Sequence, residues 1–148
     1  MMATIETLTS LPPADRQRLV EVWEDAVRAT HHFFGEDDIQ FFKPLVRDAY
    51  LDSMQLACLR DAAGHIVGFI GTTGERVDML FVDPAQHGRG IGRALMEHAL
   101  TCGARTVDVN EQNPQAVGFF LHLGFVQAGR SEVDALGKEF PILHLVKR

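Results

Sequence analysis

A run of closely spaced glycines limits what this chain can fold into more than any other feature of its sequence. Gly88, Gly90 and Gly92 stand at alternate positions between the apolar run 77–81 and residues that recur at helical spacing: Ile91, Ala94, Leu95, His98, Ala99 and Cys102. Without side chains, the backbone of such a strand-to-helix turn can close on a ligand. The N–H groups of the first helical turn point outward, with the positive end of the helix dipole behind them. The sequence therefore predicts an anion site, with a phosphate as the expected ligand.

The spacing of these glycines excludes two common phosphate-binding motifs. A dinucleotide-binding loop needs Gly-x-Gly-x-x-Gly, and its third glycine would fall on Arg93 or Leu95. Asp108 does lie about 20 residues further on, where such a loop expects a ribose-binding acid. A Walker A loop needs Gly-Lys before Ser or Thr, which the chain lacks. Arg89 and Arg93 add positive charge beside the turn, and the alternative is a glycine-rich turn that only joins a strand to a helix.

The glycine-rich stretch resembles the loop of a known family. His87-Gly88-Arg89-Gly90-Ile91-Gly92 is similar to the acyl-coenzyme A pyrophosphate loop of the GCN5-related N-acetyltransferases, the GNAT family, whose pattern is Arg/Gln-x-x-Gly-x-Gly/Ala. His87 departs from the first position of that pattern. The resemblance implies that this loop and the first turn of the next helix bind the pyrophosphate through His87, Gly88, Arg89, Gly90, Ile91, Gly92 and Arg93.

A second segment, residues 113–125, resembles the family signature Asn-x-x-Ala-x-x-Phe/Leu-Tyr-x-x-x-Gly-Phe. The resemblance implies that Asn113 and the following helix, with Phe119 and Phe120, line the pantetheine arm of coenzyme A. The tyrosine of that signature, usually proposed to protonate the departing thiolate, is Phe120 in this chain, whose single tyrosine is Tyr50. Considered alone, the segment is also compatible with an ordinary capped helix that packs its phenylalanines into the core.

In the same family, the strand before the glycine loop splays from its neighbour and offers backbone groups to the pantetheine. By position these groups belong to Leu80, Phe81 and Val82. The family's usual base corresponds to Arg76, which cannot accept a proton. Asp78 lies two residues along, on the same face of an alternating strand, and is the first candidate base. The alternative is a half-exposed strand residue that forms an ion pair with Arg76.

Two neighbouring histidines are the second candidates for proton removal. His31 and His32 follow the first predicted helix, where family members often build the acceptor pocket. A histidine with a pKa near ~6.5 can accept a proton from an ammonium group, directly or through water. The alternative is that they pack a loop. The chain's 7 histidines show no metal-ligand spacing, so the sequence predicts no metal site.

The order of predicted elements is β-α-α-β-β-β-α-β-α-β-β, which is also the order of the GNAT fold. The resemblance implies an α/β fold with a mixed central sheet of about six or seven strands and helices on both faces. At 148 residues we expect a single domain, 1–148. Asn113, Pro114 and Gly124 suit the two ends of the last helix. Pro44 interrupts the second helical pattern, so its regular part is expected to begin near Lys43.

Composition excludes several classes of protein. The formal net charge of -6 argues against a nucleic-acid-binding protein, and no apolar run approaches the ~18 residues of a membrane span. Cys58 and Cys102 form no disulfide framework, which suits a reducing compartment. The N-terminus lacks the basic and apolar regions of a signal peptide. These features predict a cytoplasmic protein without nucleic-acid or membrane partners.

Thr30-His31 and residues 109–113 also resemble a subgroup of small bacterial acetyltransferases, and the resemblance implies an N-acetyltransferase that uses acetyl-coenzyme A as cosubstrate. The acceptor is expected to be a primary amine, on a protein lysine, a protein N-terminus or a small molecule. Direct attack on the thioester within a ternary complex is expected, with strand backbone groups polarising the carbonyl. The alternative, suggested by Phe120, is a non-catalytic acyl-coenzyme A sensor or interaction module. A homodimer is expected only by analogy with the family.

Overall fold

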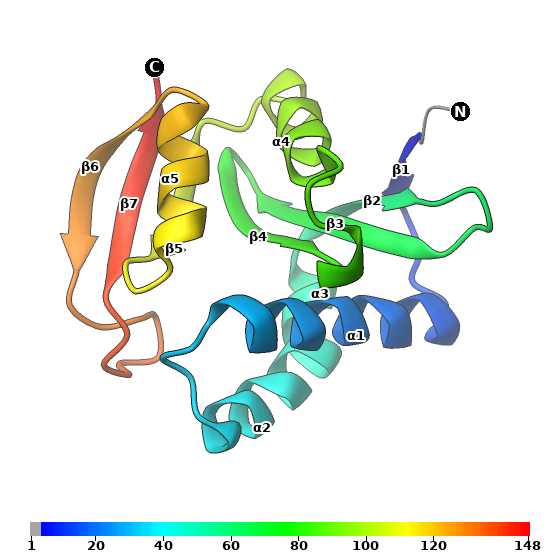
Figure 1. Ribbon diagram of the computed structural model, residues 1–148, viewed down its shortest axis with the longest axis horizontal. Coiled ribbons are helices and arrows are strands. Elements are labelled where there is room, and N and C mark those ends of the chain that lie inside the picture. Colours follow the sequence, from blue (N-terminus) through cyan, green and yellow to red (C-terminus); the bar gives the residue numbers. More distant parts are fainter. Residues whose placement is uncertain (1–3) are drawn as a thin grey trace.

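The computed structural model describes residues 4–148 and contains one mixed sheet. Figure 1 shows its strands, in the order β1-β2-β3-β4-β5-β7-β6. Neighbouring strands are antiparallel except for β4 and β5, which run parallel. The strands are β1 (Ile5–Leu8), β2 (Gln55–Arg60), β3 (Ile66–Thr73), β4 (Arg76–Val82), β5 (Thr106–Asn110), β6 (Phe125–Ser131) and β7 (Ile142–Lys147). The predicted mixed α/β sheet and the order of elements are confirmed.

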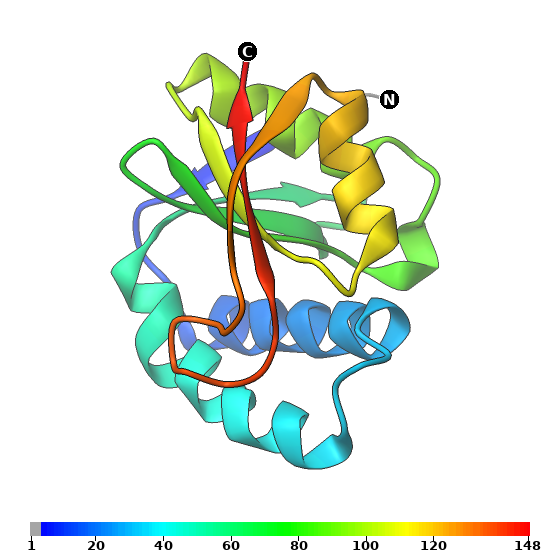
Figure 2. The same ribbon diagram turned by 90° about the vertical axis from the view of Figure 1, so that its left-hand side faces the viewer.

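Helices cover both faces of this sheet, as Figures 1 and 2 show. They are α1 (Pro13–Thr30), α2 (Glu36–Leu45), the π-helix η1 (Val46–Tyr50), α3 (Leu51–Ser53), the 3-10 helix η2 (Pro84–Gln86), α4 (Ile91–Thr101) and α5 (Pro114–His122). On one face, α4 and α5 pack around Leu95, Met96 and Phe120. On the other, Trp23 of α1 and Leu51 of α3 belong to a second buried cluster. Alternating strand residues supply both clusters, because successive side chains point to opposite faces.

The prediction for the second helix is wrong at its start. α2 begins at Glu36, seven residues before Lys43, and Pro44 lies inside it. The helix starts there because the Gly35 N–H donates to the Asp38 carboxylate (2.8 Å), which satisfies a free donor at the helix end. Pro44 has no N–H to donate, and the turns that follow it widen into the π-helix η1 instead of ending the helix.

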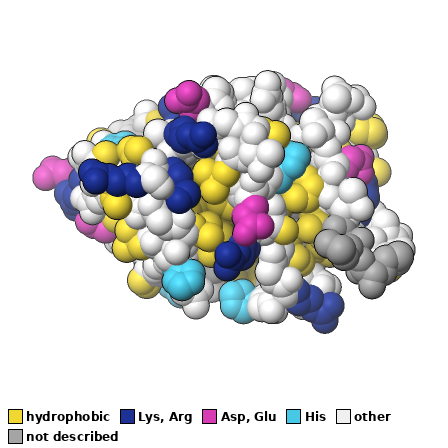
Figure 3. Space-filling view, turned by 90° about the horizontal axis from the view of Figure 1, so that it is seen from above, with side chains coloured by type: hydrophobic (Ala, Val, Ile, Leu, Met, Phe, Trp, Pro, Cys, Tyr) yellow, Lys and Arg dark blue, Asp and Glu magenta, His cyan; other side chains and the backbone are white. Residues whose placement is uncertain are grey.

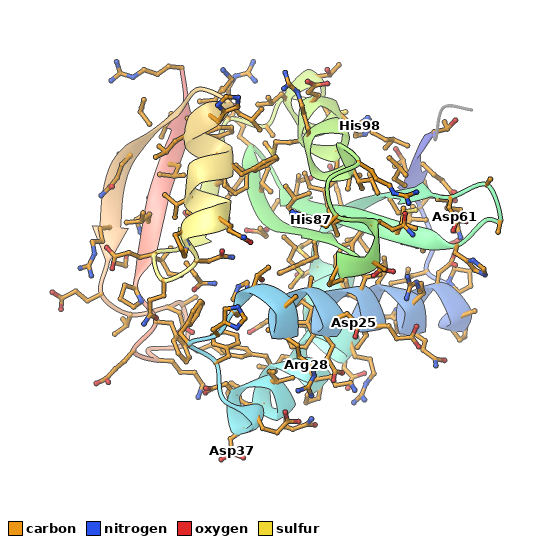
Figure 4. All side chains as sticks on the ribbon, in the orientation of Figure 1. Asp25, Arg28, Asp37, Asp61, His87 and His98 are labelled. Atoms are coloured by element: carbon orange, nitrogen blue, oxygen red, sulfur yellow. The ribbon has the colours of Figure 1, made fainter. Side chains whose placement is uncertain are left out.

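The loops at the lower end of the sheet join its two halves. The β6–β7 loop contacts the segment between α1 and α2, where the ring centroid of Phe140 lies 4.7 Å from that of Phe34. Arg28, labelled in Figure 4, links the two helices by donating to Glu36 of α2 at 2.6 Å and to Glu24 of its own helix at 2.9 Å. The half of the sheet with β1–β4 is therefore joined to the half with β5–β7 in two places. At one end β4 pairs with β5, and at the other end the loops are in contact.

A fork opens between β4 and β5 near the middle of the sheet. The two strands pair only at Arg76–Thr106 and Val77–Val107. On the other side of β4, the register to β3 shifts so that Asp78 has no partner, which makes it the extra residue of a β-bulge. A bulge bends its strand and re-aims nearby side chains. The bulge at Asp78 is thus the local cause of the divergence, and the fork opens beyond it.

Candidate active site

One cavity of about 430 Å³ passes through this fork and gathers almost all the predicted site residues. Its wall includes side chains from both faces of the sheet. The predicted residues in the wall are His31, Asp78, Leu80, Phe81, Val82, His87, Gly88, Gly90, Ile91, Gly92, Arg93, Asn113, Phe119 and Phe120. Among the predicted residues, Arg89 and His32 are outside that wall and are exposed to solvent. Residues far apart in sequence thus form one site.

The glycine loop has the open geometry that an anion site needs. Gly88 and Gly90 adopt positive φ angles of 82° and 75°, and a Cβ at either would meet nothing within 4 Å. Gly90 is the N-cap of α4, whose first hydrogen bond runs from the Ala94 N–H to the Gly90 carbonyl (3.0 Å). The N–H groups of the preceding turn therefore point out of the helix end. His87, labelled in Figure 4, begins this loop.

Positive side chains near the loop are exposed rather than buried. Arg93 pairs with Glu97 one turn along α4 (2.9 Å), and both side chains are exposed. Exposed pairs of this kind contribute little to stability, so Arg93 is free to exchange its partner for a phosphate. Figure 3, a view onto the upper end of the molecule, shows Lys and Arg side chains gathered toward the side that carries α5, β6 and β7 in Figure 1.

The α5 segment forms the apolar wall of the cavity. Asn113 is buried and its side chain accepts from the Ala116 N–H (3.3 Å), so it caps α5 as predicted. Phe120 is 4% exposed and packs edge-on against Phe119 (5.1 Å between centroids). Tyr50, in contrast, belongs to η1 and packs against the cluster on the opposite face, outside the cavity wall. Burial raises the pKa of its hydroxyl.

Asp78 faces the cavity and already has two partners. One of its oxygens accepts from the Arg76 guanidinium, and the other accepts from the Thr73 hydroxyl. The ion pair anticipated as the alternative for Asp78 is therefore present. Each carboxylate oxygen can accept more than one hydrogen bond, so these partners leave room for a substrate N–H. Whether Asp78 also takes a proton stays a prediction.

His31 is buried at the end of α1 with both ring nitrogens engaged. Nδ1 lies 2.8 Å from the Thr30 hydroxyl, which also lies 2.8 Å from the Ala26 carbonyl, and the Asn110 side-chain amide lies 3.2 Å from Nε2. All three contacts are satisfied when Nδ1–H donates to Thr30 and Nε2 accepts from Asn110. Burial, with a smaller contribution from the charge of His32, lowers the pKa of His31 to about 4. A neutral ring with an occupied lone pair is a poor base but a good support for Asn110.

Burial of His31 makes the stability of the fold depend on pH. Between its folded pKa of about 4 and the ordinary value of 6.5, the unfolded chain binds a proton that the folded chain does not. Stability is therefore lost as pH falls below the unfolded pKa, and between pH 7 and pH 5 we expect a loss of about 2 kcal/mol from this group. Denaturant unfolding of the wild type and His31→Gln at both pH values measures it. The variant should lose less stability than the wild type by that amount.

The structure adds cavity residues that the motifs did not indicate as part of the site. The most important are Asp108 and Asn110 of β5, which lie across the fork from Asp78. The sequence pointed to Asp108 only as the ribose-binding acid of a dinucleotide-binding loop, and the spacing of the glycines excludes such a loop. The other additions are Ala26 and Thr30 of α1, Val77 and Met79 of β4, Gln86 of η2, Val107 and Val109 of β5, and Gln115 and Ala116 of α5. Their positions follow from how β4 and β5 separate, which no single segment of sequence encodes.

Comparison with known proteins identifies the family. The model of the acetyltransferase (GNAT) domain matches residues 34–140. The chain belongs to the GNAT family. It is 44% identical over 131 residues to peptidyl-lysine N-acetyltransferase YjaB of Salmonella typhimurium, covering 88% of this chain and 90% of the relative. The Escherichia coli protein of the same name is 43% identical over 130 residues, covering 87% and 88%.

Solved GNAT structures agree with the fold. The solution structure of apo-form YjaB from Escherichia coli has a TM-score of 0.88 at 40% identity and covers 99% of this chain and 97% of its own. The PaiA N-acetyltransferase from Thermoplasma acidophilum, crystallised in complex with coenzyme A, has a TM-score of 0.75 at 17% identity, with 100% of both chains covered. This chain is accordingly an N-acetyltransferase, an enzyme that moves an acetyl group to an amine.

Within residues 4–148, the structure contains neither a membrane-spanning helix nor a group of metal ligands. No helix there combines the length and the apolar character that crossing a membrane requires. No three His, Cys, Asp or Glu side chains in that range are grouped as metal ligands.

Proposed function

We propose that this enzyme binds acetyl-coenzyme A in the forked cavity and transfers the acetyl group to the ε-amine of lysine in proteins. The observation that carries the proposal is the single cavity, which joins the glycine loop to a pair of carboxylates through the fork. The open N-terminus of α4 fits a pyrophosphate, and the apolar wall of Phe119 and Phe120 fits the pantetheine arm. The names of the two YjaB relatives support lysine as the acceptor.

The residues of the fork suit direct attack by the amine in a ternary complex. Beyond the bulge at Asp78, β4 no longer pairs with β5, so backbone groups at Leu80, Phe81 and Val82 face the cavity and can polarise the thioester carbonyl. A lysine amine has a pKa of ~10.4, so only about one in 2,500 is unprotonated at pH 7. The reaction therefore needs a group that takes up the proton. Asp78 is the proposed base, because it lies on the strand that holds those backbone groups.

Coenzyme A release from acetyl-coenzyme A measures this function directly. The panel contains a lysine peptide with a blocked N-terminus, the same peptide with acetylated lysine, a lysine-free peptide with a free N-terminus, and a small polyamine. Release with the first peptide alone supports the lysine assignment. Release only with the free N-terminus, or only with the polyamine, would assign that amine as the acceptor in place of lysine. Tight binding of acetyl-coenzyme A without turnover on any acceptor identifies a sensor instead.

The absence of a tyrosine at Phe120 leads to a prediction about the departing thiolate. A thiol with a pKa near ~8.5 carries negative charge readily, so the thiolate can leave unprotonated and take its proton from water. Phe120→Tyr should therefore hold or raise kcat. Tyr50→Phe should change stability and leave kcat unchanged, because Tyr50 lies outside the cavity wall. A hundredfold loss of kcat in folded Tyr50→Phe with normal coenzyme A affinity would make Tyr50 the acid.

The remaining parts of the proposal concern the whole molecule. We place it in the cytoplasm of a bacterium, as a single domain over residues 1–148. Two free cysteines, one buried and one exposed, suit a reducing compartment. The edge strands β1 and β6 each leave one side unpaired within residues 4–148, which offers a second copy a surface for homodimerisation. Light scattering of the purified chain measures its oligomeric state.

A further inference from the structure

Three polar side chains form a continuous hydrogen-bonded chain across neighbouring strands. His144 of β7 lies between Asp108 of β5 and Ser131 of β6. Its Nδ1 is 2.8 Å from Asp108 Oδ1, and its Nε2 is 2.7 Å from Ser131 Oγ. The sheet register sets this arrangement, because Asp108 pairs with His144, and Gly129 on the other side leaves no side chain beside the ring.

This chain lies on the face of the sheet that is opposite α4 and α5. The neighbouring residues Val107 and Leu145 point into the core beneath those helices, so Asp108 and His144 point the other way. Asn110, two residues after Asp108, points to that face as well and contacts His31 at the end of α1. Asp108 and Asn110 belong to the cavity wall. The hydrogen-bonded chain therefore begins at the side of the fork away from the glycine loop, where an acceptor can approach.

The two carboxylates at this end of the cavity differ in what they already bind. Both oxygens of Asp78 are engaged, and one of them is paired with the Arg76 guanidinium. Asp108 uses only Oδ1, toward His144, and within residues 4–148 no side chain pairs with its Oδ2. Glu111, a nearby carboxylate after β5, is neutralised by Arg130 at 2.8 Å. Of the two carboxylates in the cavity wall, Asp108 is therefore the one with an oxygen that no side chain of residues 4–148 already contacts.

The pattern of Ser131, His144 and Asp108 is also that of a serine nucleophile with its base. That role requires the serine to face a substrate cavity, but Ser131 and His144 are outside the wall that Asp108 helps to form. The same contacts have a simpler effect on Asp108. The Asp108 carboxylate can only accept, so Nδ1 carries a proton and donates to Oδ1, while Ser131 contacts the other ring nitrogen; together these contacts fix the orientation of the carboxylate.

We infer that Asp108 binds the protonated amine of the acceptor through Oδ2 and selects cationic acceptors, with His144 and Ser131 as its positioning residues. This inference rests on the proposed function and assigns the ammonium-binding group of the same site. Asp78, across the fork, then receives the proton from an amine that Asp108 has already captured. A hydrogen bond between charged partners is strong enough to affect acceptor binding by about 10- to 100-fold.

Steady-state kinetics with charged and uncharged amines test the role of Asp108. With a lysine peptide, Asp108→Asn should raise the acceptor KM by about 10- to 100-fold and leave the KM for acetyl-coenzyme A and kcat within about threefold. With an aromatic amine that is uncharged at pH 7, the same variant should show no increase in KM. His144→Gln and Ser131→Ala should raise the lysine-peptide KM by a smaller factor, again only for the charged acceptor.

Glu132→Gln is the matched control. It removes the same charge as Asp108→Asn, and Glu132 is an exposed residue next to Ser131. An equal KM increase in this control would assign the effect to long-range charge and overturn the inference. So would a loss of kcat with unchanged KM in Asp108→Asn, or an equal penalty for the uncharged amine. Calorimetry of the lysine peptide with the coenzyme A complex gives the same comparison without turnover. There, an unchanged Kd in Asp108→Asn overturns the inference, whatever the outcome for acetyl transfer.

Discussion

Gly90→Glu should weaken coenzyme A binding by about 100-fold or more, to the limit of detection by calorimetry. Gly90 is the N-cap of α4, and a Cβ there meets nothing within 4 Å, so the new side chain enters the space assigned to the pyrophosphate. The added carboxylate would repel the phosphates at short range and compete for the same N–H groups. At a helix N-terminus that carboxylate also interacts favourably with the helix dipole, which favours a folded variant.

The positive φ of Gly90 requires a control for backbone strain. Gly64, in the β2–β3 turn, has a φ of 88° and equally open surroundings, but it lies outside the cavity wall. Gly64→Glu should therefore reproduce the strain, of order 1–2 kcal/mol, and retain coenzyme A affinity. The coenzyme A affinity of Gly90→Ala should lie between those of the wild type and Gly90→Glu, because alanine adds the backbone strain without the charge. Unchanged affinity in folded Gly90→Glu would show that the phosphates bind elsewhere.

The local structure that a short segment of sequence determines was predicted correctly. The glycine loop is one such segment, since alternate glycines between a strand and a helix dictate an open turn whatever surrounds it. Asn113 and Pro114 are another, because an N-cap and the first helical residue act within one turn. The apolar run 77–81 is likewise a strand, since it lies within β4 (Arg76–Val82).

Features that depend on strand register could not be predicted in this way. The sequence alternation placed Asp78 on the face of Arg76, but the bulge that opens the fork depends on how β4 aligns with β3. Asp108 acquires its partners from residues 131 and 144, which reach it only after β6 and β7 pair. The start of the second helix was predicted wrongly from Pro44 for a similar reason. The missing N–H of Pro44 disturbs one turn, but tertiary packing decides whether the helix continues through it.

Asp78→Asn should lower kcat by about 100-fold or more and leave the KM for acetyl-coenzyme A nearly unchanged. The amide keeps the size of the side chain and can still accept from Thr73, but it cannot take a proton. Steady-state rates with a lysine peptide from pH 6 to pH 10 measure the effect. The deficit should shrink toward high pH, where more of the acceptor amine is already unprotonated. An intact rate at every pH would transfer proton removal to water or a histidine.

Arg76→Gln separates a base from a structural ion pair. If Asp78 serves mainly to hold Arg76, removing either partner breaks the same contact, and both variants should lose activity and stability together. If Asp78 accepts the proton, the two variants should diverge. Arg76 holds the carboxylate but cannot itself accept a proton, so its removal should leave kcat nearly unchanged. A matching hundredfold loss in folded Arg76→Gln would therefore reject Asp78 as the base. A large loss of kcat in Asp78→Asn but not in Arg76→Gln would support a catalytic role for the bulge at Asp78, because the bulge turns that carboxylate toward the fork.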